Sequence, residues 1–498
     1  MGSRAGAGAW LAGLALLALL CSTAAAYEHS GAGERFLEWA KERGAIAPKI
    51  EVVEEPELGG YGIRAKSMIR KNDEIVRIPR SLVINRGTLV ELFQKDIPED
   101  RKSQGAVDAR ASLIWGLERM DKMSNGTNTE AHVLAFFILY NRAVPQLLDY
   151  GPWLDVLPQE FHNPVHFDES TVELLVGSEL YEWTKRLKNQ TAEFWREGVS
   201  PTVEVLASTM AEAGFDVDWA AVFSLASWKW AMSVVSSRST FIPHQGLSIA
   251  LLADVFNHRP YQAAKQPLKQ LAENGDLLIV AQQTYGTGSQ VYIDYGKMTS
   301  ADFLQLYGFV DDESENESVP FWFTLHPSDP MVDQKRDFLT DLGYRSELVL
   351  PLNRRPSKEL MFYLRLLTSH AGDFAVMKED PMTYFDKMLS PDNELRALMH
   401  LIQVADTKRL KFPTDDKGDI VLLDGDDLTV DERLAIQVRL RQKQTLLRLL
   451  SYATVARDAA AAEMMEGRGP PPTEAAELPS SVESEGQEER LQQEAMGV

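Results

Sequence analysis

The apolar residues of this 498-residue chain change their spacing several times, and that change constrains the fold more than any other feature. Short β-type runs, bounded by turns rich in Gly, Asn and Asp, lie at 50–53, 62–65, 74–78, 277–282 and 290–293. From about 89 to 236, and again from 329 onward, apolar residues recur at the spacing of an amphipathic helix. Strands interrupted by a long helical insert and followed by a separate helical region predict an α+β fold.

Individual helices follow from the same spacing. They are predicted at Arg35–Arg43, Ala131–Tyr140, Thr171–Lys188 and Ala221–Val235. The last helix is expected to begin with a capping box formed by Thr429 and Glu432. From Gly467 onward Pro, Glu, Ser and Gln dominate, and this composition predicts a disordered tail.

Residues 1–26 have the pattern of a secretory signal peptide. Arg4 precedes an uncharged apolar run, Trp10–Leu20, and small residues precede Tyr27. The run is shorter than the roughly 20 residues that a membrane span needs, so we expect cleavage, no stable membrane span afterwards, and entry into the endomembrane or secretory pathway. An uncleaved signal anchor is the alternative. Glycosylation sequons at Asn125, Asn189 and Asn316 agree with this route.

Cysteine content and charge exclude several classes of function. The single cysteine, Cys21, lies in the signal segment, which excludes disulfides, zinc–thiolate sites, iron–sulfur clusters and a cysteine nucleophile in the mature chain. With the nine histidines scattered, we expect no metal site. The formal net charge is −22, of which 27–462 carries −16. An acidic body of this kind argues against nucleic-acid binding and favours a basic segment of a protein as the partner.

Four local patterns follow one another along the chain. Gly59–Gly62 forms a turn between predicted strands, and Arg238 ends a helical run. Asn257-His258 follows an apolar run, and Tyr295-Gly296 follows a predicted strand and precedes Phe309. Each pattern alone has an ordinary structural explanation as a turn or a helix end. Nucleophile-elbow, P-loop, zinc-protease and dinucleotide-binding glycine motifs are absent from the sequence.

Together and in this order, the patterns resemble those of the SET-domain protein methyltransferases, in the branch of Rubisco large-subunit lysine methyltransferase and actin-histidine methyltransferase. The likeness runs from Phe36 to about Asp458 and includes Trp153 and Leu157-Pro158 in the helical insert. The implied organisation is a signal peptide at 1–26, a SET domain at 27–320 with its insert at about 89–225, a helical Rubisco-methyltransferase-like substrate-binding domain at 321–462, and a disordered acidic tail at 463–498.

The resemblance also implies S-adenosylmethionine as the cofactor and a role for each matching residue. Gly59, Gly60 and Tyr61 would contact the cofactor through their backbone, and Arg238 would bind its carboxylate. Asn257 and His258 would lie beside the adenine, and Phe309 would stack on it. Tyr295 would also contact the cofactor. Tyr295 would be the catalytic residue. Arg238, Thr240 and Tyr295 would contact the substrate.

The sequence leaves the acceptor residue open. Two positions after the matching Arg, lysine-modifying relatives tend to carry an aromatic residue and the histidine-modifying relative carries Asn, whereas this chain has Thr240. We expect lysine in a non-histone protein, because lysine is the commoner acceptor in the family, with histidine as the alternative. A catalytically inactive SET fold that binds peptides is a second alternative. We also expect the protein to be a monomer. The alternative to the secretory pathway as its location is the plastid of an alga with complex plastids.

Overall fold

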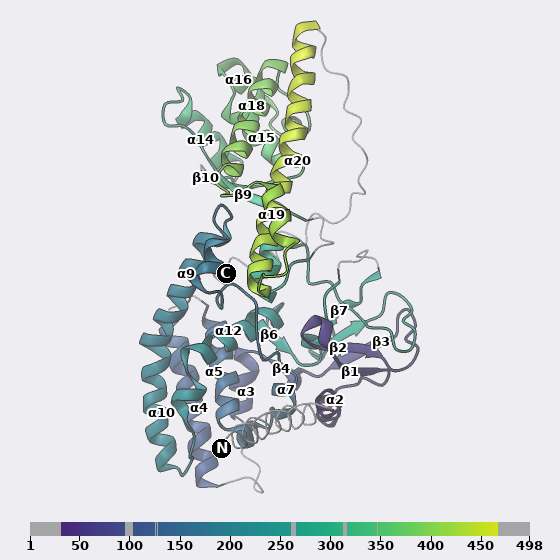
Figure 1. Cartoon of the computed structure of the whole chain (residues 1–498), viewed down its shortest axis with the longest axis vertical. Helices are drawn as coiled ribbons and strands as arrows, with labels where there is room; N and C mark the ends of the chain where they lie inside the picture. Colours follow the sequence, from purple (N-terminus) through teal and green to yellow (C-terminus); the bar gives the residue numbers. More distant parts are fainter. Residues whose placement is uncertain are drawn as a thin grey trace, which may run out of the picture. The chain divides into compact units, whose positions relative to one another are not determined.

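The computed structural model describes residues 31–94, 103–124, 126, 128–259, 265–311, 316–345 and 347–466. They divide into two compact units, which we call the first unit (31–161 and 191–296) and the second unit (162–190 and 297–466). Helices and small antiparallel sheets occur in both units, which confirms the α+β fold (Figure 1). The predicted signal peptide, Asn125 and the tail from Gly467 lie outside the described residues.

The first unit combines three small sheets with a group of helices. Its elements are α2 (Ala32–Glu42), β1 (Ile50–Glu55), the 3₁₀ turn η1 (Pro56–Leu58), β2 (Gly60–Ala65), β3 (Glu74–Ile78), η2 (Arg80–Leu82), β4 (Val83–Ile84), α3 (Arg86–Gln94), α4 (Gln104–Met123), α5 (Thr129–Ala143), α6 (Pro145–Leu148), α7 (Gly151–Leu154), the π-helical turn η4 (Trp195–Val199), α10 (Ser200–Glu212), α11 (Trp219–Val222), α12 (Leu225–Arg238), β5 (Thr240–Ile242), β6 (Gly246–Ala250), η5 (Ala253–Val255), β7 (Leu268–Leu271) and β8 (Leu277–Val280).

The sheets of the first unit are antiparallel. β1 pairs with β2, β3–β8–β7 form a second sheet, and β4–β6–β5 form a third. Helix α5 is buried on all sides over Val133–Tyr140 and contacts α4 and α12 (Figure 1). A helix that is apolar all round needs neighbours on every face, so α5 forms the centre of this unit's core.

The second unit is mainly helical. Its elements are α8 (Glu169–Glu173), the greater part of α9 (Leu180–Phe194), α13 (Ser300–Tyr307), β9 (Ser318–Thr324), α14 (Val332–Asp341), β10 (Glu347–Asn353), α15 (Lys358–Leu367), α16 (Ala371–Glu379), α17 (Thr383–Asp386), α18 (Pro391–Arg409), α19 (Asp416–Leu423) and α20 (Val430–Glu466). The predicted capping box of α20 is present: the Thr429 N–H donates to Glu432 Oε2 at 2.8 Å, and the Glu432 N–H donates to Thr429 Oγ1 at 3.2 Å. The helix continues through Glu466, so residues 463–466 are helical and not part of a disordered tail.

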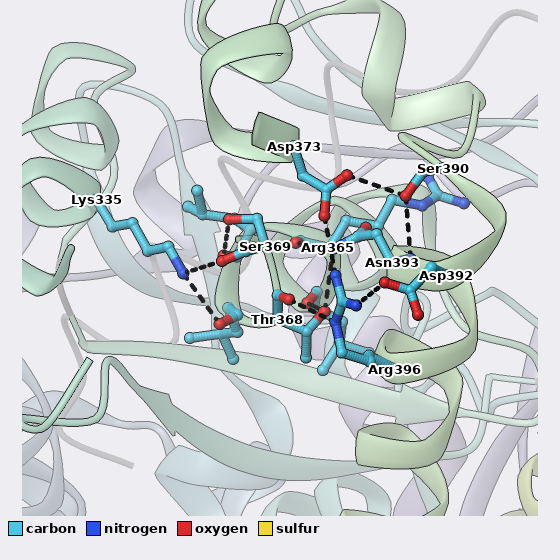
Figure 2. Close-up of polar contacts among 12 residues, drawn as sticks. Lys335, Arg365, Thr368, Ser369, Asp373, Ser390, Asp392, Asn393 and Arg396 are labelled. Atoms are coloured by element: carbon cyan, nitrogen blue, oxygen red, sulfur yellow. Dashed lines mark hydrogen bonds and ion pairs between the residues drawn. The ribbon is translucent and has the colours of Figure 1, made fainter. Parts of the chain in front are cut away.

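Side chains from neighbouring helices donate hydrogen bonds to the carbonyl groups at the C-terminal end of α15 (Figure 2). Lys335 Nζ donates to the Leu367 carbonyl at 3.2 Å, and Arg396 Nε donates to the Thr368 carbonyl at 3.0 Å. Arg396 also donates to Asp373 Oδ2 at 2.9 Å. The last carbonyls of a helix lack partners within the helix and carry partial negative charge, so cations are favourable there. This network ties α14, α15, α16 and α18 together.

Several predicted elements are wrong in detail. The helix predicted at Thr171–Lys188 is broken between α8 and α9 at Gly177, whose φ of +94° is not helical. The helix predicted at Ala221–Val235 restarts at α12, because the Ser224 side chain accepts from the Ser227 N–H as an N-cap. Residues 290–293 make isolated bridges to two different partners and do not form a strand. The predicted all-helical region from 329 contains β10, which pairs with β9.

The division into units follows compactness and differs from the predicted boundaries. Residues 162–190, from the predicted insert, and 297–320 belong to the second unit. The domain boundaries at 27–320, 89–225 and 321–462 stay a prediction. Within the described part of the chain, no helix is both long and apolar enough to span a membrane, and no cluster of His, Cys, Asp or Glu is suited to a metal ion.

Candidate functional site

Arg238 is the last residue of α12, and its side chain is almost completely buried. Its Nη1 donates to the Asp254 carbonyl oxygen at 2.5 Å and lies 4.0 Å from the Asp254 carboxylate. Its Nε has no hydrogen-bond partner among the described residues. A buried guanidinium N–H without a partner is costly, so this position can donate to a bound anion.

Asp254 lies in η5, and its side chain is fully buried. Oδ2 accepts from Trp153 Nε1 at 2.9 Å, whereas Oδ1 has no partner among the described residues. Burial raises the pKa of this carboxyl, and the Arg238 charge opposes the shift only in part. Asp254 was not among the residues predicted from the sequence. The signal was available, because an acidic residue inside the apolar run 250–256 predicts a buried carboxyl.

Tyr295 and His258 are joined by their backbone and side chains. The Tyr295 N–H donates to His258 Nδ1 at 3.1 Å, and the Tyr295 hydroxyl donates to the Phe256 carbonyl at 2.8 Å. The two ring centroids are 5.0 Å apart. The His258 side chain is only 3% exposed, and because its Nδ1 accepts a hydrogen bond, the neutral ring carries its proton on Nε2. Desolvation raises the pKa of Tyr295 to about 12, so its hydroxyl stays neutral at physiological pH.

Asn257 links this group to the turn between β1 and β2. Asn257 Nδ2 donates to the Tyr61 carbonyl at 3.2 Å. This contact requires glycine at position 62, because a β-carbon there would lie 2.7 Å from Asn257 Nδ2 and 2.5 Å from Gln290 Nε2. By contrast, no described atom lies within 4 Å of a β-carbon placed on Gly59 or Gly60. The backbone of these two glycines therefore has open space beside it.

The charges in this part of the first unit influence one another. The nearby Arg238 guanidinium lowers the pKa of Tyr295, and the Asp254 carboxylate raises it, although both effects are smaller than that of burial. The structure thus brings together Tyr61, Arg238, Asn257, His258 and Tyr295, with Asp254 among them. The geometry offers a cationic donor, Arg238, and a neutral phenol, Tyr295, whose hydroxyl is held by the Phe256 carbonyl.

Two further predicted site residues have other contacts. Thr240 begins β5 and is paired with Ser248 on β6. Phe309 belongs to the second unit, where its ring centroid lies 5.1 Å from that of Phe303 and 6.0 Å from that of Tyr307. Their contacts with substrate and with adenine, like the other assigned roles, stay predictions.

Comparison with known proteins shows what this chain is similar to. Residues 326–446 match the family described as Rubisco LSMT substrate-binding. The chain is 26% identical to human actin-histidine N-methyltransferase and 25% identical to the mouse protein, in each case over 442 residues, 85% of this chain and 68% of the relative. The fold is similar to the SET domain of LSMT bound to MeLysine and AdoHcy, with a TM-score of 0.63, 19% identity, and coverage of 92% of this chain and 99% of that one. Rubisco LSMT bound to sinefungin and monomethyllysine gives a TM-score of 0.62 at 20% identity, again covering 92% and 99%.

The chain has the fold of these SET-domain structures and is similar in sequence to actin-histidine N-methyltransferases. The matched family segment, 326–446, lies inside the predicted substrate-binding domain at 321–462 and within the second unit. In this chain, the residues expected to serve chemistry lie mainly in the first unit, around Arg238, Asn257 and Tyr295.

Proposed function

We propose that the protein is an S-adenosylmethionine-dependent N-methyltransferase that modifies a lysine side chain of a non-histone protein. The grouping of Arg238, Asp254 and Tyr295 in the first unit is the observation that carries the proposal. It combines an anion-binding donor with a neutral phenol whose hydroxyl is held in place, and these are the groups that methyl transfer from a sulfonium requires.

The residues present fit this cofactor. Arg238 Nε is a buried donor with no partner in the described part of the chain, and it suits the carboxylate of an amino-acid group. The space beside Gly59 and Gly60 lets a ligand approach their backbone. When bound, S-adenosylmethionine supplies a methyl group carried by a positively charged sulfur. The similar solved structures contain AdoMet, AdoHcy or sinefungin, which supports the assignment.

The protein's part in the reaction is orientation and electrostatics. The Tyr295 hydroxyl donates to the Phe256 carbonyl, which fixes the direction of its oxygen lone pairs. With a pKa of about 12 the phenol remains neutral, so its oxygen can face partial positive charge as a dipole without being deprotonated. A lysine must lose its proton before attack, and desolvation in a buried channel favours the neutral amine.

Histidine is the second candidate acceptor, and a specific observation favours it. The curated relatives cited above act on a histidine of actin, whereas the similar solved structures hold lysine or methyllysine. Thr240 matches neither the aromatic residue nor the Asn expected from the family. A neutral imidazole already has a lone pair, so the same Tyr295 geometry serves both acceptors.

The remaining parts of the proposal concern the partner and the location. The charge of −16 over 27–462 supports a basic segment around the acceptor and argues against nucleic acid. We further propose a monomer that enters the secretory pathway after loss of residues 1–26. The exposure of Asn189 and Asn316 is compatible with their glycosylation.

The test uses the full chain and two variants. Isothermal titration with S-adenosylmethionine should detect binding by the wild-type protein, and Arg238→Ala should weaken it at least tenfold, roughly the effect of one charge-assisted hydrogen bond. Tyr295→Phe should lower the methyl-transfer rate by about 10²-fold or more while leaving cofactor affinity within a few-fold.

Arg196→Ala is the matched control, because Arg196 is exposed and lies outside the site. No binding heat from the wild-type protein would favour the inactive peptide-binding fold. Wild-type rates in both site variants would show that the residues are assigned wrongly.

A further inference from the structure

Outside the proposed methyl-transfer site, residues of α4 and α10 line a groove in the first unit. Figure 1 shows these two helices side by side. The volume of the groove is about 600 Å³, within the range of sites that hold a ligand or a side-chain anchor. The two helices are antiparallel, since a β-carbon on Gly105 near the start of α4 would lie 3.3 Å from the Ala213 carbonyl that follows α10. Each helix therefore contributes one stripe of side chains to the groove.

One half of the groove is apolar. Trp115 on α4 is 39% exposed and Val205 on α10 is 51% exposed, with the buried Leu206 beside them. A partly exposed indole in a concave surface is the kind of anchor found at the centre of protein interfaces. This half favours a large apolar side chain from a partner.

The other half of the groove is acidic. Asp108 on α4 and Glu212 at the end of α10 line it, and α10 contains no basic residue. The Asp108 carboxylate accepts a hydrogen bond from the neutral Gln104 amide at 2.8 Å. The C-terminal end of α10 adds partial negative charge at the same place. This half therefore favours a Lys or Arg side chain.

We propose that this groove binds an amphipathic helix of a partner protein that presents a large apolar residue and a Lys or Arg seven positions apart. The distance along α4 from Asp108 to Trp115 is seven residues, roughly 10 Å, and two helical turns of a bound helix span the same length on one face. This proposal is independent of the proposed methyl-transfer function, because no groove residue belongs to the group formed by Tyr61, Arg238, Asp254, Asn257, His258 and Tyr295.

The test uses random peptides as probes for the partner helix. A phage library of random 15-residue peptides is selected on the folded full-length protein and counter-selected on Val205→Asp. Selected peptides should contain the apolar and basic residues at helical spacing. By fluorescence polarisation, their affinity should fall at least tenfold for Val205→Asp and at least threefold for the double variant Asp108→Asn/Glu212→Gln. Val455→Asp, an exposed position on α20, is the matched control and should change affinity less than twofold.

Thermal melts of each variant check that the substitutions leave the fold intact, as expected because none of these positions is buried. The proposal is overturned if no selected peptide depends on Val205, or if the dependent peptides lack a basic residue or bind the double variant normally. It is also overturned if size-exclusion chromatography shows that Val205→Asp abolishes a homodimer, because the groove would then bind a second copy.

Discussion

Glu179 in the second unit should make the stability of this protein depend on pH in a specific way. Its Oε1 accepts from Gln442 Nε2 at 2.8 Å, and its Oε2 is buried without a hydrogen-bond partner among the described residues. Burial raises the pKa of Glu179 to about 7 from the ordinary value of 4.5, and the Lys408 charge offsets this only partly. The perturbation we consider is Glu179→Gln, which keeps the shape and removes the titration.

The sign and the magnitude follow from linkage. Between pH 4.5 and 7 the folded protein retains a proton on Glu179 that the unfolded chain has lost, so stability falls as the pH rises and levels off above about 7. The difference between these two pKa values corresponds to a loss of at most about 3 kcal/mol by pH 8. Glu179→Gln should lack this loss. Its stability relative to the wild type should therefore improve from pH 5 to about pH 7 and then level off.

The assay is a series of thermal melts of wild type and Glu179→Gln between pH 5 and 8. A change of 1 kcal/mol shifts the melting temperature by roughly 2–4 °C in a unit of this size, so the two curves should diverge by several degrees. Glu182→Gln is the matched control, because Glu182 is exposed and lies in α9, the helix that begins directly after Glu179. Parallel melting curves for wild type and Glu179→Gln across this range would refute the reasoning.

Three further predictions concern stability and are checked by denaturant unfolding. Gly62→Ala should destabilise the protein by about 1–3 kcal/mol, because the added methyl group would lie within 3 Å of neighbouring atoms. Gly60→Ala, where the added methyl group has open space, should leave the stability nearly unchanged. Equal effects of the two substitutions would contradict the packing argument. Arg365→Ala should cost about 3–5 kcal/mol by leaving a buried Glu394 carboxylate unpaired, while the exposed Arg336→Ala should cost less than about 1 kcal/mol. A large loss for Arg336 or none for Arg365 would show that burial does not govern these pairs. Thr429→Ala should cost about 1 kcal/mol by removing the N-cap of α20, and an unchanged midpoint would mean that the cap contributes nothing.

Local sequence signals were sufficient where one segment contains all the information needed. The strand predicted at 74–78 has the same bounds as β3, and the capping box at Thr429 is formed as expected. Both depend on residues within a few positions of each other. Such elements are predictable because their hydrogen bonds and apolar spacing are local.

Elements that depend on distant pairing were not predictable in the same way. β10 contains Pro351, which argues against a strand, yet it pairs with β9 because Val319 and Leu352 bury their side chains in the core of the second unit. The break at Gly177 was missed because the apolar spacing continues across it. Tertiary packing decided both cases.

The site shows the same division. The order of the four patterns was visible in the sequence, but the contacts among them were not, because residues near 61, 238, 257 and 295 meet only after folding. Asp254 is the clearest omission, since its position beside Arg238 and Trp153 depends on three separate elements. Gly62 was noted as part of a turn, and the structure adds a steric reason for it.

The central claim is methyl transfer to a protein side chain, and one measurement tests it most directly. Full-length protein is incubated with cell extract and S-adenosylmethionine carrying an isotopically labelled methyl group, and mass spectrometry locates the label. We expect label on a lysine nitrogen within a basic segment of a non-histone protein, and at least about 10²-fold less label with Tyr295→Phe. Label on histidine would correct the acceptor alone. Absence of label with the wild-type protein, or equal labelling with Tyr295→Phe, would contradict the account.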